Sequence, residues 1–174
     1  MVDTAGLMLS QPAFTGNRIG IVTQGGGWGV LSADLCEAHG MKVPPLNDRA
    51  VSLMDAFLPP FWSRRNPVDL VAPGKVAMIT DAIDIILKNV DLDAILLLGL
   101  GYMTLRGRLW TESPVIPREA IEASARLMIG EEAKLLGLIE EQIKKYGKPI
   151  IPVIDQVAFD DPSGHNIVNR LDRE

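Results

Sequence analysis

Apolar runs alternate with segments of helical periodicity along this chain. Four runs rich in β-branched and other apolar residues predict strands, at 18–23, 41–44, 94–100 and 149–155. Elsewhere apolar residues recur every three or four positions, which predicts helices at 1–10, 28–39, 47–57, 75–89, 117–146 and 164–173. Strands that alternate with helices in this order are typical of βαβ units and a parallel sheet.

We therefore expect an α/β fold of three layers, flavodoxin-like (Rossmann-like), in which helices flank a parallel sheet of four to five strands. The run 94–100 is apolar throughout and is expected at the centre of the sheet beside 18–23. Pro152 has no N–H, which favours a position near an edge of the sheet or at a bulge for the last strand. Two prolines, two arginines and a tryptophan interrupt the pattern at 101–117, which predicts a loop at the functional end of the sheet.

Two of the helices carry further local signals. Leu31, Leu35 and Ala38 recur at spacings of four and three, which predicts that they form the face of helix 28–39 that packs on the sheet. Asn47 is the expected N-cap of the next helix, because its side-chain oxygen can accept a hydrogen bond from the first turn.

The strongest candidate for a binding site is the loop that directly follows the first predicted strand. The loop consists of Gly25, Gly26, Gly27, Trp28 and Gly29 and leads straight into a helix. Glycines let a bound group approach the backbone closely, and the first turn of a helix offers unpaired N–H donors. These donors and the helix dipole favour an anion, so we predict that the loop binds phosphate. The simpler alternative is that the glycines only let the helix lie close to the sheet.

The two familiar nucleotide-binding motifs do not fit this loop. Val30 stands where a dinucleotide-binding loop needs its third small residue, and no Gly-Lys-Ser/Thr follows for a P-loop. No acidic residue stands where one would bind a ribose. We therefore expect no tightly held NAD or ATP.

Composition narrows the class of protein. The chain has 174 residues, of which 47% are hydrophobic, and a net charge of −5, which argues against general nucleic-acid binding. Cys36 is the single cysteine and cannot form an internal disulfide, so a reducing compartment is expected. No apolar run approaches the roughly 20 residues of a membrane span. We expect a cytoplasmic protein with neither membrane nor nucleic acid as a partner.

The domain organisation is read from the same pattern. Residues 1–16 are expected to be the remnant of an N-terminal helix and linker, and residues 17–174 to be a single domain that is a fragment of a longer chain. No repeat or low-complexity segment divides the chain.

Other titratable residues are weaker candidates for a catalytic or metal-binding role. His39 is expected to meet the negative end of the first helix dipole as a cap. His165 has a glycine neighbour but stands at the start of the last predicted helix. Asp69 and Asp155 are expected to be turn acids, since no second carboxylate or metal-ligand spacing accompanies either. We therefore predict neither a catalytic residue nor a metal site.

Four segments together resemble one known family. They are Gly16-Asn17-Arg18-Ile19-Gly20-Ile21-Val22-Thr23, the 25–29 loop, Leu58-Pro59-Pro60 and Asn66-Pro67-Val68-Asp69-Leu70. In this order they resemble the NDP-forming (ADP-forming) acyl-CoA synthetases, relatives of succinyl-CoA synthetase, and in particular their flavodoxin-like ligase-CoA domain. The resemblance covers residues 5–100 best.

The resemblance implies a role for the loop. Family members interconvert an acid, CoA, a nucleoside triphosphate and acyl-CoA through an acyl phosphate and a phosphorylated histidine on a mobile loop. By similarity, the 25–29 loop would begin one of two helices that cradle the phosphohistidine. Gln24, Asn66 and Asp69 are candidates for a supporting role, Asn66 either as a further donor or only as the residue that orients its turn. Trp28 replaces the proline that the family has in this loop.

The resemblance also implies that other domains or subunits supply parts of the reaction. The CoA-binding domain, the ATP-grasp domain and the Ser-His-Thr-Gly phosphorylation motif are not in this sequence, so we expect other ligase domains or subunits as partners. CoA, ATP or ADP, and Mg are expected only for the complete enzyme, and the chain alone should not catalyse the full reaction. The alternatives are a noncatalytic regulatory or assembly module of a synthetase-like acyltransferase and a flavodoxin-like protein that binds FMN or a small phosphoester. A homodimer is also left open.

Overall fold

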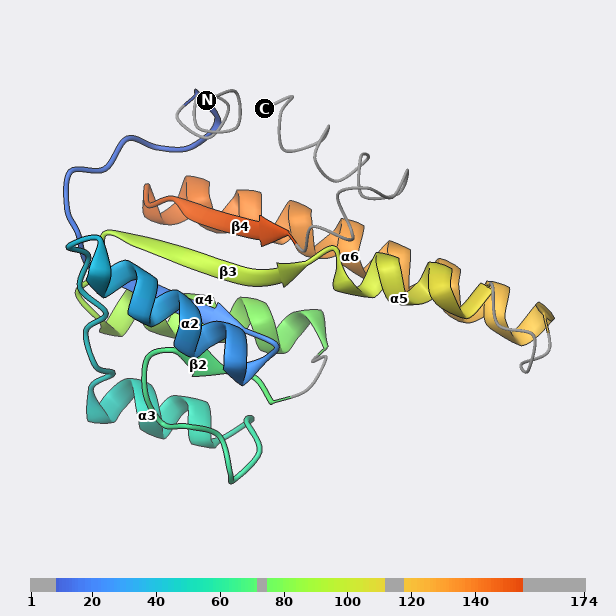
Figure 1. The fold of residues 1–174 in the computed structure, drawn as a ribbon, viewed down its shortest axis with the longest axis horizontal. Coiled ribbons are helices and arrows are strands. Elements are labelled where there is room, and N and C mark those ends of the chain that lie inside the picture. Colours follow the sequence, from blue (N-terminus) through green and yellow to red (C-terminus); the bar gives the residue numbers. More distant parts are fainter. Residues whose placement is uncertain (1–8, 72–74, 112–117, 155–174) are drawn as a thin grey trace.

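A single parallel sheet organises the chain (Figure 1). The computed structural model describes residues 9–71, 75–111 and 118–154. In chain order the elements are β1 (Ile19–Thr23), α2 (Gly26–Ala38), α3 (Asp48–Asp55), β2 (Val68–Asp69), α4 (Val76–Asn89), β3 (Ala94–Leu100), α5 (Tyr102–Thr111), α6 (Arg118–Tyr146) and β4 (Ile150–Ile154). The predicted helix 164–173, His165 and Asp155 lie outside the described residues, as does most of the predicted helix 1–10.

The strand order confirms the predicted α/β fold. The four strands lie side by side in the order β2-β1-β3-β4, and all neighbours are parallel. β1 and β3 therefore occupy the centre, with Ile19 opposite Ala94 and Thr23 opposite Leu98. β4 is the edge strand of the described sheet, and Pro152 lies within it opposite Leu97, in agreement with the position expected for a proline.

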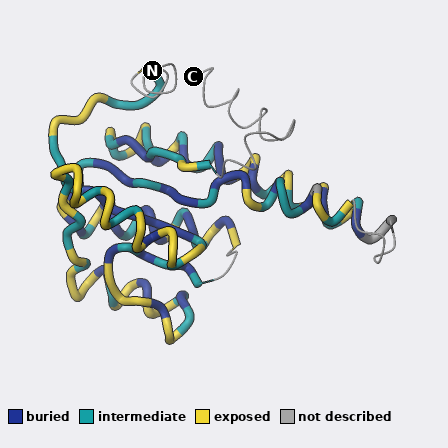
Figure 2. Tube along the Cα trace, in the orientation of Figure 1, coloured by how far each residue is buried: buried dark blue, intermediate teal, exposed yellow. Residues whose placement is uncertain are grey.

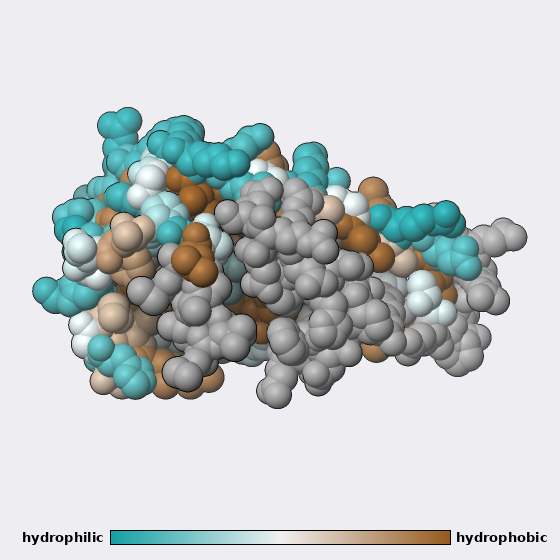
Figure 3. Space-filling model, turned by 90° about the horizontal axis from the view of Figure 1, so that it is seen from above, coloured by the Kyte–Doolittle hydropathy of each residue, from teal (hydrophilic) through white to brown (hydrophobic). Residues whose placement is uncertain are grey.

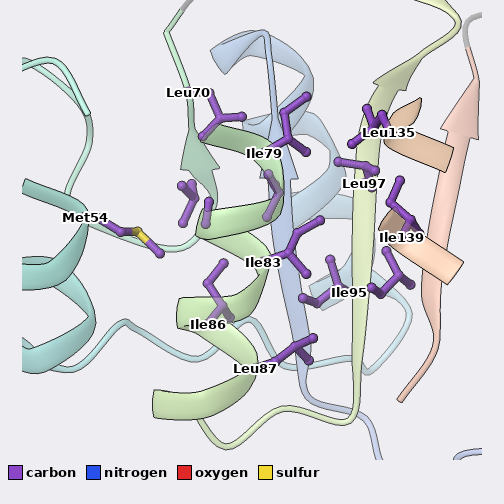
Figure 4. Packing of buried hydrophobic residues seen from close by; sticks show 14 of the residues in the cluster. Met54, Leu70, Ile79, Ile83, Ile86, Leu87, Ile95, Leu97, Leu135 and Ile139 are labelled. Atoms are coloured by element: carbon purple, nitrogen blue, oxygen red, sulfur yellow. The ribbon is translucent and has the colours of Figure 1, made fainter. Parts of the chain in front are cut away.

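The larger core lies between the sheet and the helices α3, α4 and α6. Ile79, Ile83 and Ile86 of α4 are inaccessible to solvent, and their spacing of four and three is the one predicted for a buried helical face. Figure 4 shows Ile79 and Ile83 on the side of α4 that faces the sheet, where Ile95 and Leu97 of β3 lie. Burial of such side chains, worth about 1.5–3 kcal/mol each, is the main force that fixes α4 on the sheet.

α2 covers the opposite face of the sheet, but with a different side from the one predicted. Leu31 and Leu35 are 59% and 52% exposed, and Ala38 is exposed as well, so the expected packing face is wrong. The helix instead turns Gly29 and the partly buried Ala33 and Cys36 inward. These residues are small, so α2 can lie close to the sheet, and its larger apolar residues remain exposed. Figure 2 shows exposed positions in yellow along α2.

The predicted strand 41–44 is also wrong. Only Lys42 forms an isolated bridge with Arg18, and the short strand beside β1 is β2. The reason is that the side chain of Asn66 takes the place of a strand: its Oδ1 accepts from Ile21 N at 2.9 Å and its Nδ2 donates to Ile19 O at 2.9 Å. The same Nδ2 donates to Pro44 O at 3.0 Å, and the backbone of Lys42 accepts from Ile19 N and donates to Asn17 O, so residues 41–44 are tied to β1 without forming a strand.

A helix replaces the loop predicted at 101–117. α5 begins directly after β3 and packs against α6, and the two form a hairpin that projects beyond the end of β3 (Figure 1). The helices approach closely at Gly107, where an added Cβ would lie 3.2 Å from Ala125 Cα. α6 runs without interruption through Gly130. Residues 112–117 lie outside the described residues.

Candidate functional site

Three helices begin at the carboxyl edge of the sheet. α2 follows β1, α4 follows β2 and α5 follows β3, and all three strands run in the same direction. Their N-termini therefore face the same side, where parallel α/β sheets bind their ligands. The starts of α5 and α2 differ in what already satisfies their first N–H groups, whereas α4, like α2, has no side-chain cap and no acidic residue in its first turn.

The start of α5 is occupied by the protein itself. Glu132 of α6 is 2% exposed, and its two carboxylate oxygens accept from Gly101 N at 2.6 Å and from Thr104 N at 2.9 Å. A carboxylate at this place satisfies the first N–H groups and the positive end of the helix dipole together. α5 is therefore closed to a second anion.

The start of α2 is open. Thr23 Oγ1 accepts from Gly25 N at 3.0 Å and donates to Gly25 O at 2.9 Å, which fixes the loop where it leaves β1. Gly25 O in turn accepts from the N–H groups of Trp28 and Gly29. Among the described residues, the N–H groups of Gly26 and Gly27 have no such acceptor, and α2 has neither a side-chain cap nor an acidic residue in its first turn.

The loop is open on its outer side at two of its glycines. A Cβ added at Gly25 or Gly27 would meet no atom within 4 Å. Gly29 is different, because its Cβ would lie 3.0 Å from Thr23 Cγ2 and 3.1 Å from Pro67 Cβ. Gly29 therefore permits close packing, whereas Gly25 and Gly27 leave the backbone accessible.

The candidate supporting residues lie in three different settings. Asp69 is adjacent to the loop, since its Oδ2 is 2.6 Å from the position of a Cβ on Gly26. Gln24 is partly buried, and its Oε1 is buried with no hydrogen-bond partner among the described residues. Asn66 is 8% exposed and commits its amide to the backbone of β1 and of Pro44, so it has the orienting role rather than that of an anion donor.

Sequence reasoning missed Glu132, although one signal for it exists. This acidic residue stands on the apolar stripe of α6, seven residues after the buried Ala125 and four before the buried Leu136. An acid at such a position requires a partner in the protein interior. For Asp69 the sequence contained the residue but no sign of its contact with Gly26, which depends on the pairing of β2 with β1.

The remaining candidates play no part at this edge. Burial raises the pKa of the Cys36 thiol, and Glu37 adds to this shift, so the reactive thiolate is disfavoured. His39 is the C-cap residue at the far end of α2, where its backbone N–H donates to Leu35 O and Cys36 O. Within residues 9–71, 75–111 and 118–154, no three His, Cys, Asp or Glu side chains are close enough together to hold a metal ion.

Large apolar side chains are exposed on α2 near the open helix start and also on the α5–α6 hairpin. Trp28 is 43% exposed in the first turn of α2, next to the outward-facing Leu31 and Leu35. On the α5–α6 hairpin Leu109 and Leu127 are exposed as well, and Figure 3 shows brown apolar atoms between hydrophilic residues along this projection. In the described part of the chain, no helix has the length and apolar character needed to cross a membrane.

Comparison with known proteins gives three consistent results. The family model of the Ligase-CoA domain matches residues 19–109. The chain is 39% identical over 66 residues to the acetate–CoA ligase [ADP-forming] II subunit alpha of Pyrococcus furiosus, a match that covers 38% of this chain and 14% of that protein. It is 37% identical over 71 residues to an acetate–CoA ligase [ADP-forming] of Methanocaldococcus jannaschii, covering 41% of this chain and 10% of that protein.

Solved structures share the fold over almost the whole chain. The crystal structure of PH0766 from Pyrococcus horikoshii superimposes with a TM-score of 0.66 at 21% identity and covers 98% of this chain and 34% of that chain. The dinucleotide-forming acetyl-coenzyme A synthetase 1 of Ca. Korarchaeum cryptofilum gives a TM-score of 0.52 at 20% identity, over 98% of this chain and 37% of that chain. The chain thus spans a small part of the length of the proteins it matches.

Proposed function

Because the chain belongs to the Ligase-CoA domain family, we propose that it is the part of an ADP-forming acyl-CoA synthetase that holds a phosphoryl group supplied by a partner domain. The observation that supports this role is the open start of α2, where the N–H groups of Gly26 and Gly27 have no acceptor among the described residues. The chain's own residues bind and orient the phosphoryl group through hydrogen bonds, and they form no covalent bond to it.

The physical basis is electrostatic. Two backbone N–H groups donate to phosphoryl oxygens, and the helix dipole adds about half a positive charge at the same place. These donors are fixed before the group arrives, because Thr23 anchors the loop at Gly25. Preorganised donors of this kind stabilise developing negative charge during transfer without further rearrangement.

The partner supplies the rest of the reaction. We expect the phosphoryl group to arrive on a histidine of another ligase domain, since the Ser-His-Thr-Gly motif is not in this sequence. CoA, ATP or ADP, and Mg would be bound by the CoA-binding and ATP-grasp domains. Two of the curated relatives are named as alpha subunits of acetate–CoA ligases, which supports a role within a larger assembly.

The exposed apolar side of α2 favours a second, compatible role in assembly. Trp28, Leu31 and Leu35 form an outward apolar surface directly beside the open helix start. A partner domain docked there would exclude water from the phosphoryl group and strengthen its hydrogen bonds to the loop. The noncatalytic assembly module, as an alternative function, would keep this surface and lack phosphate binding.

Titration with inorganic phosphate tests the proposal. We expect saturable chemical-shift changes at the backbone amides of Gly26 and Gly27, measured by NMR on the full chain. Gly27→Pro removes one of the two N–H groups at a helical position that tolerates proline, and should abolish the change. Gly27→Ala is the matched control, because it keeps the N–H and its Cβ meets open space. No saturable change in the wild-type chain would refute the phosphoryl site and favour the assembly module.

A further inference from the structure

A carboxylate already lies at the open start of α2. Asp69 is the last residue of β2 and lies opposite Thr23 of β1, so both strands end where the loop begins. Its Oδ1 accepts from Val71 N at 2.9 Å, which fixes the orientation of the group. The other oxygen, Oδ2, lies 2.6 Å from the place that a Cβ on Gly26 would occupy. Only glycine at position 26 permits this approach.

No cationic side chain forms an ion pair with Asp69 in the described part of the chain. Asp69 takes part in none of the ion pairs among those residues. α2, for its part, has no side-chain cap and no acidic residue in its first turn. The negative charge of Asp69 therefore lies beside the positive end of the α2 dipole, where the two attract each other.

This contact has a consequence for any phosphoryl group that binds there. We propose that Asp69 is an internal counter-anion that regulates the phosphoryl site, an inference that rests on the proposed function. Without a phosphoryl group it stabilises the first turn of α2. When the group binds, two negative charges share that turn, and their repulsion weakens binding. The site therefore binds phosphate less tightly than the same helix start would without Asp69, and releases it more readily.

The contrast with α5 supports this assignment. Glu132 directs both carboxylate oxygens at N–H groups of α5, at 2.6 and 2.9 Å, and closes that helix start. In Asp69, by contrast, one oxygen accepts a hydrogen bond from Val71 N, and the N–H groups of Gly26 and Gly27 have no acceptor among the described residues. Asp69 thus lowers the affinity of the site without occupying its donors.

The test is the phosphate affinity of charge-neutral variants. Asp69→Asn keeps the size of the side chain and the oxygen that accepts from Val71 N, and Asp69→Ser gives a second way to remove the charge. We expect both to tighten the binding of inorganic phosphate about fivefold, or about 1 kcal/mol, followed at the amides of Gly26 and Gly27. Asp34→Asn is the matched control, since it removes an equal charge from an exposed position of α2.

A second measurement separates regulation from a general change in stability. Without phosphate, both Asp69 variants should unfold at lower temperature than the wild type, and added phosphate should reduce that difference by binding the folded state. Equal affinity in the Asp69 and Asp34 variants, or weaker binding in the Asp69 variants, would overturn the proposal and leave the phosphoryl site standing. No binding by any of the variants or by the wild type would overturn the proposed function and this inference together.

Discussion

The buried carboxylate of Glu132 should be the main determinant of whether α5 forms. α5 is ten residues long, and a helix of that length is marginal on its own. Its first turn depends on two N–H groups, at Gly101 and Thr104, that are buried and have Glu132 as acceptor. Replacement of Glu132 by alanine leaves both N–H groups unpaired in the protein interior.

The magnitude follows from those two hydrogen bonds. An unsatisfied buried N–H costs about 1–3 kcal/mol, so two cost roughly 2–6 kcal/mol. Removal of the carboxylate also removes the cost of burying its charge, which reduces the net loss. We expect Glu132→Ala to lower the free energy of unfolding by about 3 kcal/mol. Glu132→Gln keeps one acceptor and should lose roughly half as much.

Two measurements check this expectation. Urea denaturation gives the loss of stability, with Glu141→Ala and Glu141→Gln as matched controls at an exposed position of the same helix. Amide hydrogen exchange gives its location: opening of α5 should accelerate exchange at Gly101 and Thr104 about a hundredfold. A loss below about 1 kcal/mol in Glu132→Ala, or unchanged exchange at these amides, would refute the capping role.

Two further predictions concern other polar contacts of the core. Burial alone would raise the pKa of Asp84, but hydrogen bonds from Lys145, Lys88 and Tyr146 outweigh it and lower the pKa to about 2. The resulting stability, about 1 kcal/mol after screening by solvent, is present above the ordinary pKa and lost as the pH falls from about 4 to about 2. Acid titration of unfolding should show this loss in the wild type and in the control Asp81→Asn, and not in Asp84→Asn. Asn66→Asp should cost about 3 kcal/mol in urea denaturation, because a carboxylate cannot donate to Ile19 O and Pro44 O; Asn89→Asp is its control, and equal losses in the two would contradict this role.

Elements with a complete local signal follow directly from the sequence. β1, β3 and β4 are apolar runs bounded by polar or turn residues, and α4 carries a buried row at regular spacing, so each lies close to its predicted range. Asn47 caps α3 as expected, with its side chain accepting from Ala50 N. These features depend on residues that are near one another in the chain.

The elements that the sequence does not reveal depend on distant contacts. α5 is capped by a residue 28 positions beyond Thr104, and β1 is paired by the side chain of Asn66, 45 positions beyond Ile21. No local pattern contains either partner. The inward face of α2 is hidden for another reason: hydropathy favours leucine for burial, whereas the space above β1 admits only small residues such as Gly29.

The candidate site shows the same division. The sequence identifies the loop from Gly25 to Gly29 and names Asp69 as a supporting residue. It cannot distinguish Gly29, which packs against Thr23 and Pro67, from Gly27, which borders open space. It also cannot show that the N–H groups of Gly101 and Thr104 at the start of α5 are already satisfied by Glu132.

The pairing of Asn66 with β1 has a final consequence, for aggregation. A row of unpaired N–H and C=O groups along a sheet edge invites another chain to add a strand. Here a side chain covers the groups of Ile19 and Ile21 beyond the two residues that β2 pairs, and Pro152 removes one donor from β4 at the other end of the described sheet. Neither edge is a good template for strand addition, so exposed apolar helices can await a partner without a matching risk of fibril growth.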